Sequence, residues 1–148
     1  MSLRNPWLVA AGSASLAAAA LHLACIAGGP SWYRALGAGE PMARAAERGS
    51  LGPALITAAI AAILVLWAAY AFSGAGLLGR LPLLRVGLVA ITAILLLRGL
   101  VLFYPPALRR PDLSDSFILW SSLVVLALGL LYAVGTWQAW SALSKETI

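Results

Sequence analysis

The sequence predicts an all-α integral membrane protein, built as a four-helix bundle with short interfacial helices in its first connector. Of its 148 residues, 62% are hydrophobic and 10% are charged, whereas about a quarter of the residues in a soluble domain carry charge. Four apolar stretches reach the roughly 20 residues that a helix needs to cross a bilayer. They show no alternation of polar and apolar residues, which argues against barrel strands. We expect residues 1–148 to form one domain.

The four predicted spans cover residues 7–27, 53–72, 83–104 and 117–140. Four prolines fall near their ends, namely Pro6, Pro53, Pro105 and Pro106. Proline is tolerated in the first turn of a helix, where its missing N–H has no intrahelical partner, but it cannot continue a helix interior. Before the fourth span, Asp115 and Ser116 offer side-chain oxygens for an N-cap. The predicted helix ends therefore agree with the hydropathy.

The connector at residues 28–52 is the longest and most charged connection, and it predicts two short helices. Ser31 can cap the first helix, which Gly37 ends. Pro41 can open the second helix, which Gly49 ends. The segment is either an amphipathic connector that lies at the membrane interface or a lid that closes over a site in the bundle.

Charged residues on the second connector helix are spaced to form ion pairs. Glu40 and Arg44 are four residues apart, and Arg44 and Glu47 are three residues apart. Each such pair stabilises an exposed helix by about 0.2–0.5 kcal/mol. We therefore expect both pairs on the polar face of this helix.

Aromatic residues form two belts, as expected where rings meet the lipid headgroups. One belt consists of Trp7, Tyr70, Phe72, Trp137 and Trp140, and the other of Trp32, Tyr33, Phe103, Tyr104, Phe117 and Trp120. Two belts on four alternating spans predict that both termini lie on one side. Basic residues lie on both sides, with Arg4, Arg80, Arg85 and Lys145 near the termini and Arg34, Arg44, Arg48, Arg109 and Arg110 opposite. A raw count of these residues slightly favours cytoplasmic loops. We nevertheless expect cytoplasmic termini in a bacterial inner membrane, because Arg4, Arg80 and Arg85 lie beside span ends and the opposite arginines are interleaved with acidic residues.

Polar residues of all four spans are predicted to share one depth near the first connector. Counted from the connector-side ends of the spans, similar depths are reached by His22, Thr57, Arg98, Ser121 and Ser122. Trp120 lies nearby. Arg98 can extend its stem outward to headgroups about 9 Å away. Alternatively, it can face inward and bind Glu40, Glu47 or an anionic ligand, because its planar guanidinium suits carboxylate and phosphate.

The composition argues against several classes of function. The net charge of +5 is spread over span ends, which indicates contact with anionic lipid and not with nucleic acid. Cys25 is the only cysteine, so the chain has no internal disulfide or CxxC redox pair, and we expect Cys25 to fill apolar space. With one histidine and no acidic residue inside the spans, we expect no metal and no cofactor. The same lack of acidic residues argues against proton-coupled transport.

Three hypotheses about function follow. In the first, the protein binds a lipid headgroup or a small amphipathic or anionic molecule on the connector side of the bundle. Its candidate ligand-binding residues are His22, Glu40, Arg44, Glu47, Thr57, Arg98 and Trp120. In the second, the protein is an accessory subunit whose small-residue faces bind another copy or a larger membrane complex. In the third, it is a membrane enzyme for a lipid or isoprenoid, with His22 as acid or base and Arg98 on a phosphate. No catalytic motif supports the third, so we predict no catalytic residue.

Overall fold

The computed structural model describes residues 4–105 and 111–144, and this part of the chain is helical with no strand. Its elements are α1 (Pro6–Gly28), α2 (Pro30–Ala35), α3 (Glu40–Glu47), α4 (Gly52–Gly74), α5 (Leu84–Gly99), the 3₁₀-helix η1 (Leu100–Phe103) and α6 (Asp115–Leu143). Four helices are long and apolar enough to cross a membrane, namely α1, α4, α5 with η1, and α6. The prediction of an all-α bundle of four apolar helices is confirmed, and the chain is a multi-pass membrane protein.

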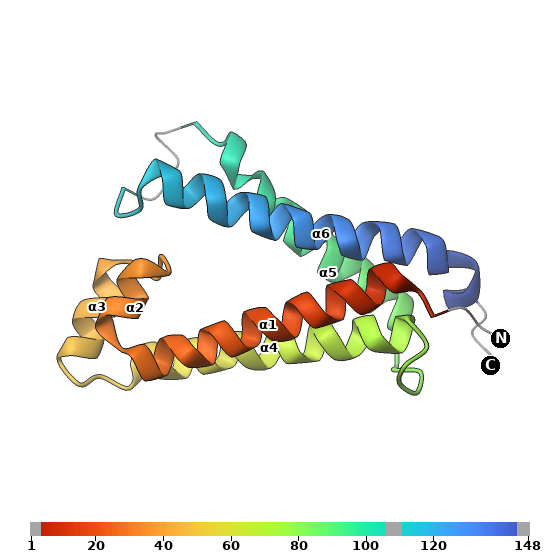
Figure 1. Ribbon diagram of the computed structural model, residues 1–148, viewed down its shortest axis with the longest axis horizontal. Helices are drawn as coiled ribbons and strands as arrows, with labels where there is room; N and C mark the ends of the chain where they lie inside the picture. The colour runs from red at the N-terminus through yellow and green to blue at the C-terminus, as the bar shows by residue number, and fades with distance from the viewer. Residues whose placement is uncertain (1–3, 106–110, 145–148) are drawn as a thin grey trace.

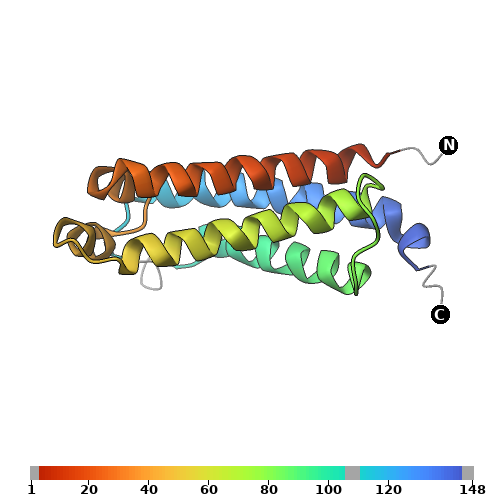
Figure 2. The same ribbon diagram turned by 90° about the horizontal axis from the view of Figure 1, so that it is seen from below.

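The four long helices pack in two layers. α1 and α4 run antiparallel in one layer, and α5 and α6 run antiparallel in the other (Figure 1). α1 begins and α6 ends at the same end of the bundle, beside the turn from α4 to α5 (Figure 2). α2 and α3 lie at the opposite end. We call these the termini end and the connector end.

At the termini end the two layers are joined by a closely packed apolar core. Leu8 of α1 contacts Gly135 of α6 and Gly74 of α4, and Leu88 of α5 contacts the same Gly74. Leu8, Leu88 and Tyr132 are fully buried. A glycine has no side chain beyond hydrogen, so helices can approach closely where one faces a partner. The layers therefore meet where α1 and α5 lie over glycines.

Hydrogen bonds reinforce this end. The hydroxyls of Ser15 on α1 and Tyr132 on α6 lie 2.9 Å apart, and both residues are completely buried. The Nδ2 amide of Asn5 donates to the carbonyl of Gly135 at 2.8 Å, while its Oδ1 caps the first turn of α1. Arg80, in the turn between α4 and α5, donates to carbonyls in the last turn of α6. Each layer thus supplies polar partners to the other.

The start of α6 differs from the prediction. Ser114, and not Asp115 or Ser116, is the N-cap residue, and its hydroxyl accepts a hydrogen bond from the N–H of Phe117 at 3.2 Å. Asp115 instead occupies the first turn of α6, where a carboxylate complements the positive end of the helix dipole.

The ends of two other helices also differ in detail. α2 begins at Pro30 because Gly29 adopts a left-handed φ of +69°, so Ser31 lies inside the first turn instead of capping it. The third span changes from α-helix to 3₁₀-helix before its end and stops ahead of Pro105. Pro106 lies outside the described residues.

Candidate functional site

The two layers separate toward the connector end (Figure 1). On the α5 face that meets α4, Gly87 packs directly against Tyr70, and Ile91 is buried. Further along the same face, Ile94 is 51% exposed and Arg98 is also exposed. Arg98 follows Gly87 by eleven residues, which is close to three full helical turns, so both residues share one face. This face of α5 is therefore packed against α4 at the termini end and exposed near the connector.

The other three helices show the same change. On α4, Ile63 lies two turns from Tyr70 on the same face and is 48% exposed. On α1, His22 lies two turns from the buried Ser15 and is only half-buried. Val125, on the α6 face that meets α1, is half-buried as well. We call these facing surfaces the interlayer opening and define them by His22, Ile63, Ile94, Val125 and Arg98.

The register of the helices places several of these residues at one depth. The contact between Tyr70 and Gly87 fixes the antiparallel register of α4 and α5, and it brings Ile63 level with Arg98 to within about one turn. The packing of α1 on α4 brings His22 level with Ile63 to within about one turn. His22 and Arg98 therefore lie at similar depths on opposite layers.

His22 presents one ring nitrogen that no described residue bonds. Its Nδ1 lies 2.7 Å from the carbonyl oxygen of Ala18, and a carbonyl only accepts, so Nδ1 carries the hydrogen of this bond. In the neutral ring, Nε2 then has a lone pair that can accept a hydrogen bond. The bond to Ala18 fixes the ring on the opening side of α1.

Arg98 is exposed, and in the described part of the chain no group accepts a hydrogen bond from its guanidinium. Two of the predicted partners of this layer lie elsewhere. Thr57 is 5% exposed and lies about one turn before Ala61, which packs on α1, so Thr57 is on the α1 side of α4 and not on the side of the opening. Trp120 is 67% exposed and lies on the outer side of α6. The structure therefore brings His22 and Arg98 to the opening and leaves Thr57 and Trp120 outside it.

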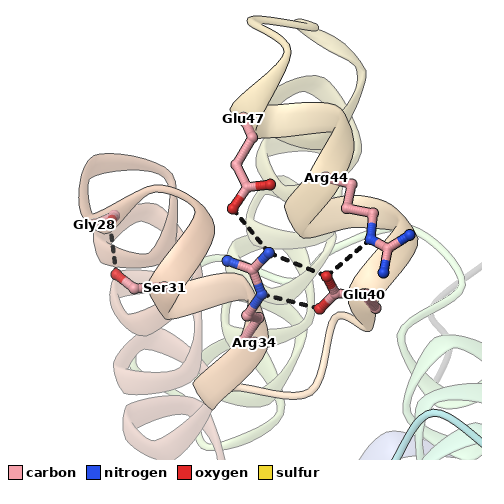
Figure 3. Close-up of polar contacts among 6 residues, drawn as sticks. All are labelled: Gly28, Ser31, Arg34, Glu40, Arg44 and Glu47. Atoms are coloured by element: carbon pink, nitrogen blue, oxygen red, sulfur yellow. Dashed lines mark hydrogen bonds and ion pairs between the residues drawn. The ribbon is translucent and has the colours of Figure 1, made fainter.

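The acidic residues of the connector bind Arg34 and not Arg98 (Figure 3). Arg34 of α2 forks onto the Glu40 carboxylate with bonds of 2.9 and 3.1 Å and contacts Glu47 at 2.8 Å. Arg44 contacts Glu40 at 3.0 Å, which confirms the pair predicted from their spacing. The predicted pair of Arg44 with Glu47 is wrong for the described side chains, since Glu47 turns to Arg34 instead.

Arg34 is at the centre of this network, and the sequence analysis did not predict this role. It precedes Glu40 by six residues across a turn, and Gly37 and Gly39 in that turn have positive φ. Two glycines between oppositely charged residues were the available signal, because they allow two short helices to fold back on each other. The network fixes α2 against α3.

The network also sets the charge state of the connector. Hydrogen bonds from Arg34 and Arg44 lower the pKa of Glu40 to about 2, and the bonds to Glu40 and Glu47 raise the pKa of Arg34. Arg34 and Glu40 are therefore charged at neutral pH. The network joins these two residues to Arg44 and Glu47. Their side chains are between 39% and 65% exposed, so water screens the pairs and their contribution to stability is small.

The connector closes one end of the interlayer opening. Cys25, Tyr33 and Ala43 form a buried cluster that holds α2 and α3 on the end of α1. From the other layer, the ring of Phe117 on α6 packs against Gly37, where a Cβ atom would overlap it. Cys25 thus fills apolar space, as predicted, and the connector touches both layers.

Among the described residues, no group of three or more His, Cys, Asp or Glu side chains could hold a metal ion. No family model, curated protein or solved structure matches the chain. The fold defines the class of protein, which is a multi-pass, four-helix membrane protein whose layers meet at one end. The candidate site residues that the structure places at similar depths on facing layers are His22 and Arg98.

Proposed function

We propose that the protein binds an anionic amphipathic molecule in the interlayer opening. The observation that supports this function is the placement of His22 and Arg98 at similar depths on facing layers, with an exposed guanidinium that no described residue bonds. The anionic group accepts hydrogen bonds from Arg98. The apolar tail lies along Ile63 and Ile94, which are about half exposed on either side.

The chemistry of the opening suits such a ligand. An arginine inside an apolar span is costly unless a partner compensates its charge, and a phosphate or carboxylate can accept two of its N–H bonds in parallel. His22 Nε2 can accept a hydrogen bond from a ligand hydroxyl. Ligand sites typically combine apolar walls with a few polar groups that fix orientation. The opening has this composition.

The test compares two lysolipids that share one acyl chain, lysophosphatidic acid and lysophosphatidylcholine. Binding to the full chain in mild detergent is measured by native mass spectrometry. Arg98→Gln removes a charge-assisted bond of about 1.5 kcal/mol, so we expect about tenfold weaker binding of the anionic lysolipid. Binding of lysophosphatidylcholine should change little.

Arg48→Gln is the matched control, because Arg48 is an exposed arginine at the end of α3, away from the opening. It should leave both affinities unchanged. Equal binding of the anionic lysolipid by the wild type and Arg98→Gln would contradict the proposed function. The same spectra of untreated protein identify any molecule that copurifies.

We further propose that the protein resides in a bacterial inner membrane with cytoplasmic termini. Arg4, Arg80 and Arg85 lie at the termini end, whereas Arg34 and Arg44 at the connector end are paired with acidic residues. Three other residues used for this prediction lie outside the described residues, namely Arg109, Arg110 and Lys145. Positive residues close to span ends orient membrane proteins.

The orientation is tested with a single-cysteine variant, Cys25→Ser with Ser50→Cys, since Ser50 is exposed in the turn before α4. A membrane-impermeant maleimide should label it in intact bacterial cells whose outer membrane has been made permeable. Labelling only after the inner membrane is opened would reverse the proposed orientation.

A further inference from the structure

A groove lies at the termini end, on the side of α5 that faces away from α4. It has a volume of about 540 Å³, and its main lining residues are Arg85, Val86, Val89, Ala90, Ala93 and Trp140. Leu143 and Ser144 complete the lining, which is apolar apart from Arg85, the indole N–H of Trp140 and the hydroxyl of Ser144. The groove and the interlayer opening lie toward opposite ends of α5.

The guanidinium of Arg85 is held at the head of this groove. It stacks on the Trp140 ring, with its central carbon 3.5 Å from the ring centroid. Stacking positions the group through the ring face and occupies none of its N–H donors. In the described part of the chain, no acceptor bonds these donors. Arg85 therefore presents a fixed positive charge with its donors available to an anion.

The depth of the groove matches one leaflet of a membrane. Arg85 is the second residue of α5, and Trp140 lies in the last turn of α6, so both lie where a spanning helix meets the headgroups. From Arg85 the groove follows α5 inward to Ala93, a distance of about 12 Å at the rise of an α-helix. The groove thus has a cation at the membrane interface and an apolar track that runs inward from it. A phospholipid has the matching arrangement, with a phosphate at the interface and an acyl chain that runs inward.

We infer that this groove binds an anionic phospholipid of the leaflet at the termini end. Its phosphate accepts hydrogen bonds from Arg85, and one acyl chain lies along Val89 and Ala93. The positive charge of Arg85 favours a lipid with net negative charge over a zwitterionic one. This site is separate from the interlayer opening and does not depend on the function proposed above.

The test uses native mass spectrometry of the full chain with dioleoylphosphatidylglycerol, and with dioleoylphosphatidylcholine as the zwitterionic comparison. Arg85→Gln should weaken phosphatidylglycerol binding about fivefold, since one basic residue near a membrane surface contributes about that much. Phosphatidylcholine binding should change little. Equal phosphatidylglycerol affinities of the wild type and Arg85→Gln would overturn the inference.

A second variant separates a bound lipid from a bound phosphate ion. Ala90→Leu with Ala93→Leu fills the apolar track and leaves Arg85 in place, so it should weaken phosphatidylglycerol binding. Ala58→Leu is the matched control, because Ala58 is exposed on α4, away from the groove. Glycerol phosphate carries the headgroup chemistry without a chain, and it should not compete for the site. If it competes as strongly as the lipid and the filled variant binds normally, the site takes a free anion and the lipid assignment is wrong.

The same spectra report the oligomeric state. If filling the track converts an oligomer to a monomer without changing lipid binding, the groove is covered by a second copy of the chain, which would also overturn the inference. Arg98→Gln should leave the effect of Arg85→Gln unchanged. A failure at one of the two sites can therefore be recognised without reference to the other.

Discussion

The two ends of the bundle are built from the same four helices, yet the layers meet at one end and separate at the other. Three glycines face the opposite layer, namely Gly74, Gly87 and Gly135, and all three lie toward the termini end. At the connector end the corresponding faces carry Ile63, Ile94 and Arg98. Helix layers in a membrane approach closely where small residues face each other. The comparison indicates that the two layers pack closely where glycines lie between them, and that overall hydropathy does not determine where this happens.

Polar groups differ between the two ends in the same way. At the termini end the hydroxyls of Ser15 and Tyr132 bond each other across the layers. At the connector end, Arg98 and the Nε2 atom of His22 face the opening, and no described residue bonds them. Ser15 and Tyr132 join the layers at one end, whereas we propose that Arg98 and His22 bind a ligand at the other.

The largest expected effect tests the closed end. At Gly135 an added Cβ would lie 2.7 Å from Leu8 Cγ and 3.0 Å from the Leu8 backbone nitrogen, and the backbone cannot move aside without separating the layers. Gly135→Ala should therefore lower the free energy of unfolding by about 1–3 kcal/mol. The measurement is reversible unfolding in mixed micelles.

Gly79→Ala is the control, because nothing lies within 4 Å of a Cβ at that position. We expect it to change stability by less than about 0.5 kcal/mol. Equal stability of the two variants would show that close packing of the layers at the termini end does not require glycine at position 135.

A smaller effect is expected for the hydrogen bond across the layers. A double-mutant cycle of Ser15→Ala and Tyr132→Phe should give a coupling of about 0.6–1.7 kcal/mol, the range from mean to maximum for bonds between membrane helices. A cycle of Ser13→Ala with Tyr132→Phe should give none, because Ser13 is exposed on the other side of α1. Equal coupling energies in the two cycles would show that the bond between Ser15 and Tyr132 does not stabilise the contact between the layers.

The smallest effect concerns the connector and is visible in acid. The pKa of Glu40 is lowered from 4.5 to about 2, so the stabilisation from its pairs with Arg34 and Arg44 is fully present above pH 4.5. This stabilisation is lost as the pH falls from 4.5 through 2, because protonation removes the charge of the carboxylate. A carbon NMR titration of the Glu40 carboxyl should give a midpoint near 2 in the wild type. It should give a higher midpoint in Arg34→Gln and an unchanged one in Arg48→Gln. The same midpoint in all three proteins would contradict the network.

The sequence predicted most of the fold because hydrophobic length is a local property. The span predicted at residues 7–27 is α1 (Pro6–Gly28), and the other spans begin and end within three residues of their predicted limits. The similar depths of His22 and Arg98 could also be predicted, since alternating helices of known length fix depth. The cap of α6 was misplaced by one residue, because Ser114, Asp115 and Ser116 can all cap and only the backbone conformation selects one.

The tertiary arrangement of the candidate site could not be predicted. The pairing of Arg34 with Glu40 and Glu47 depends on how α2 folds back on α3, which no helical spacing reveals. The separation of the layers depends on which faces meet, and the stacking of Arg85 on Trp140 joins residues 55 positions apart in the chain. These are contacts between elements, so a pattern within one element does not contain them.

The central claim is that the interlayer opening holds a specific anionic molecule, and photocrosslinking tests it most directly. Ile63 and Val65 are each 48% exposed on α4, but only Ile63 faces the opening, since two residues turn a helix by about 200°. We would place benzoylphenylalanine at either position and identify the adducts by mass spectrometry. Position 63 should give an adduct with an anionic amphiphile that disappears in Arg98→Gln, whereas position 65 should give bulk lipid adducts that do not depend on Arg98. The same bulk lipids at both positions, with no effect of Arg98→Gln, would contradict the account.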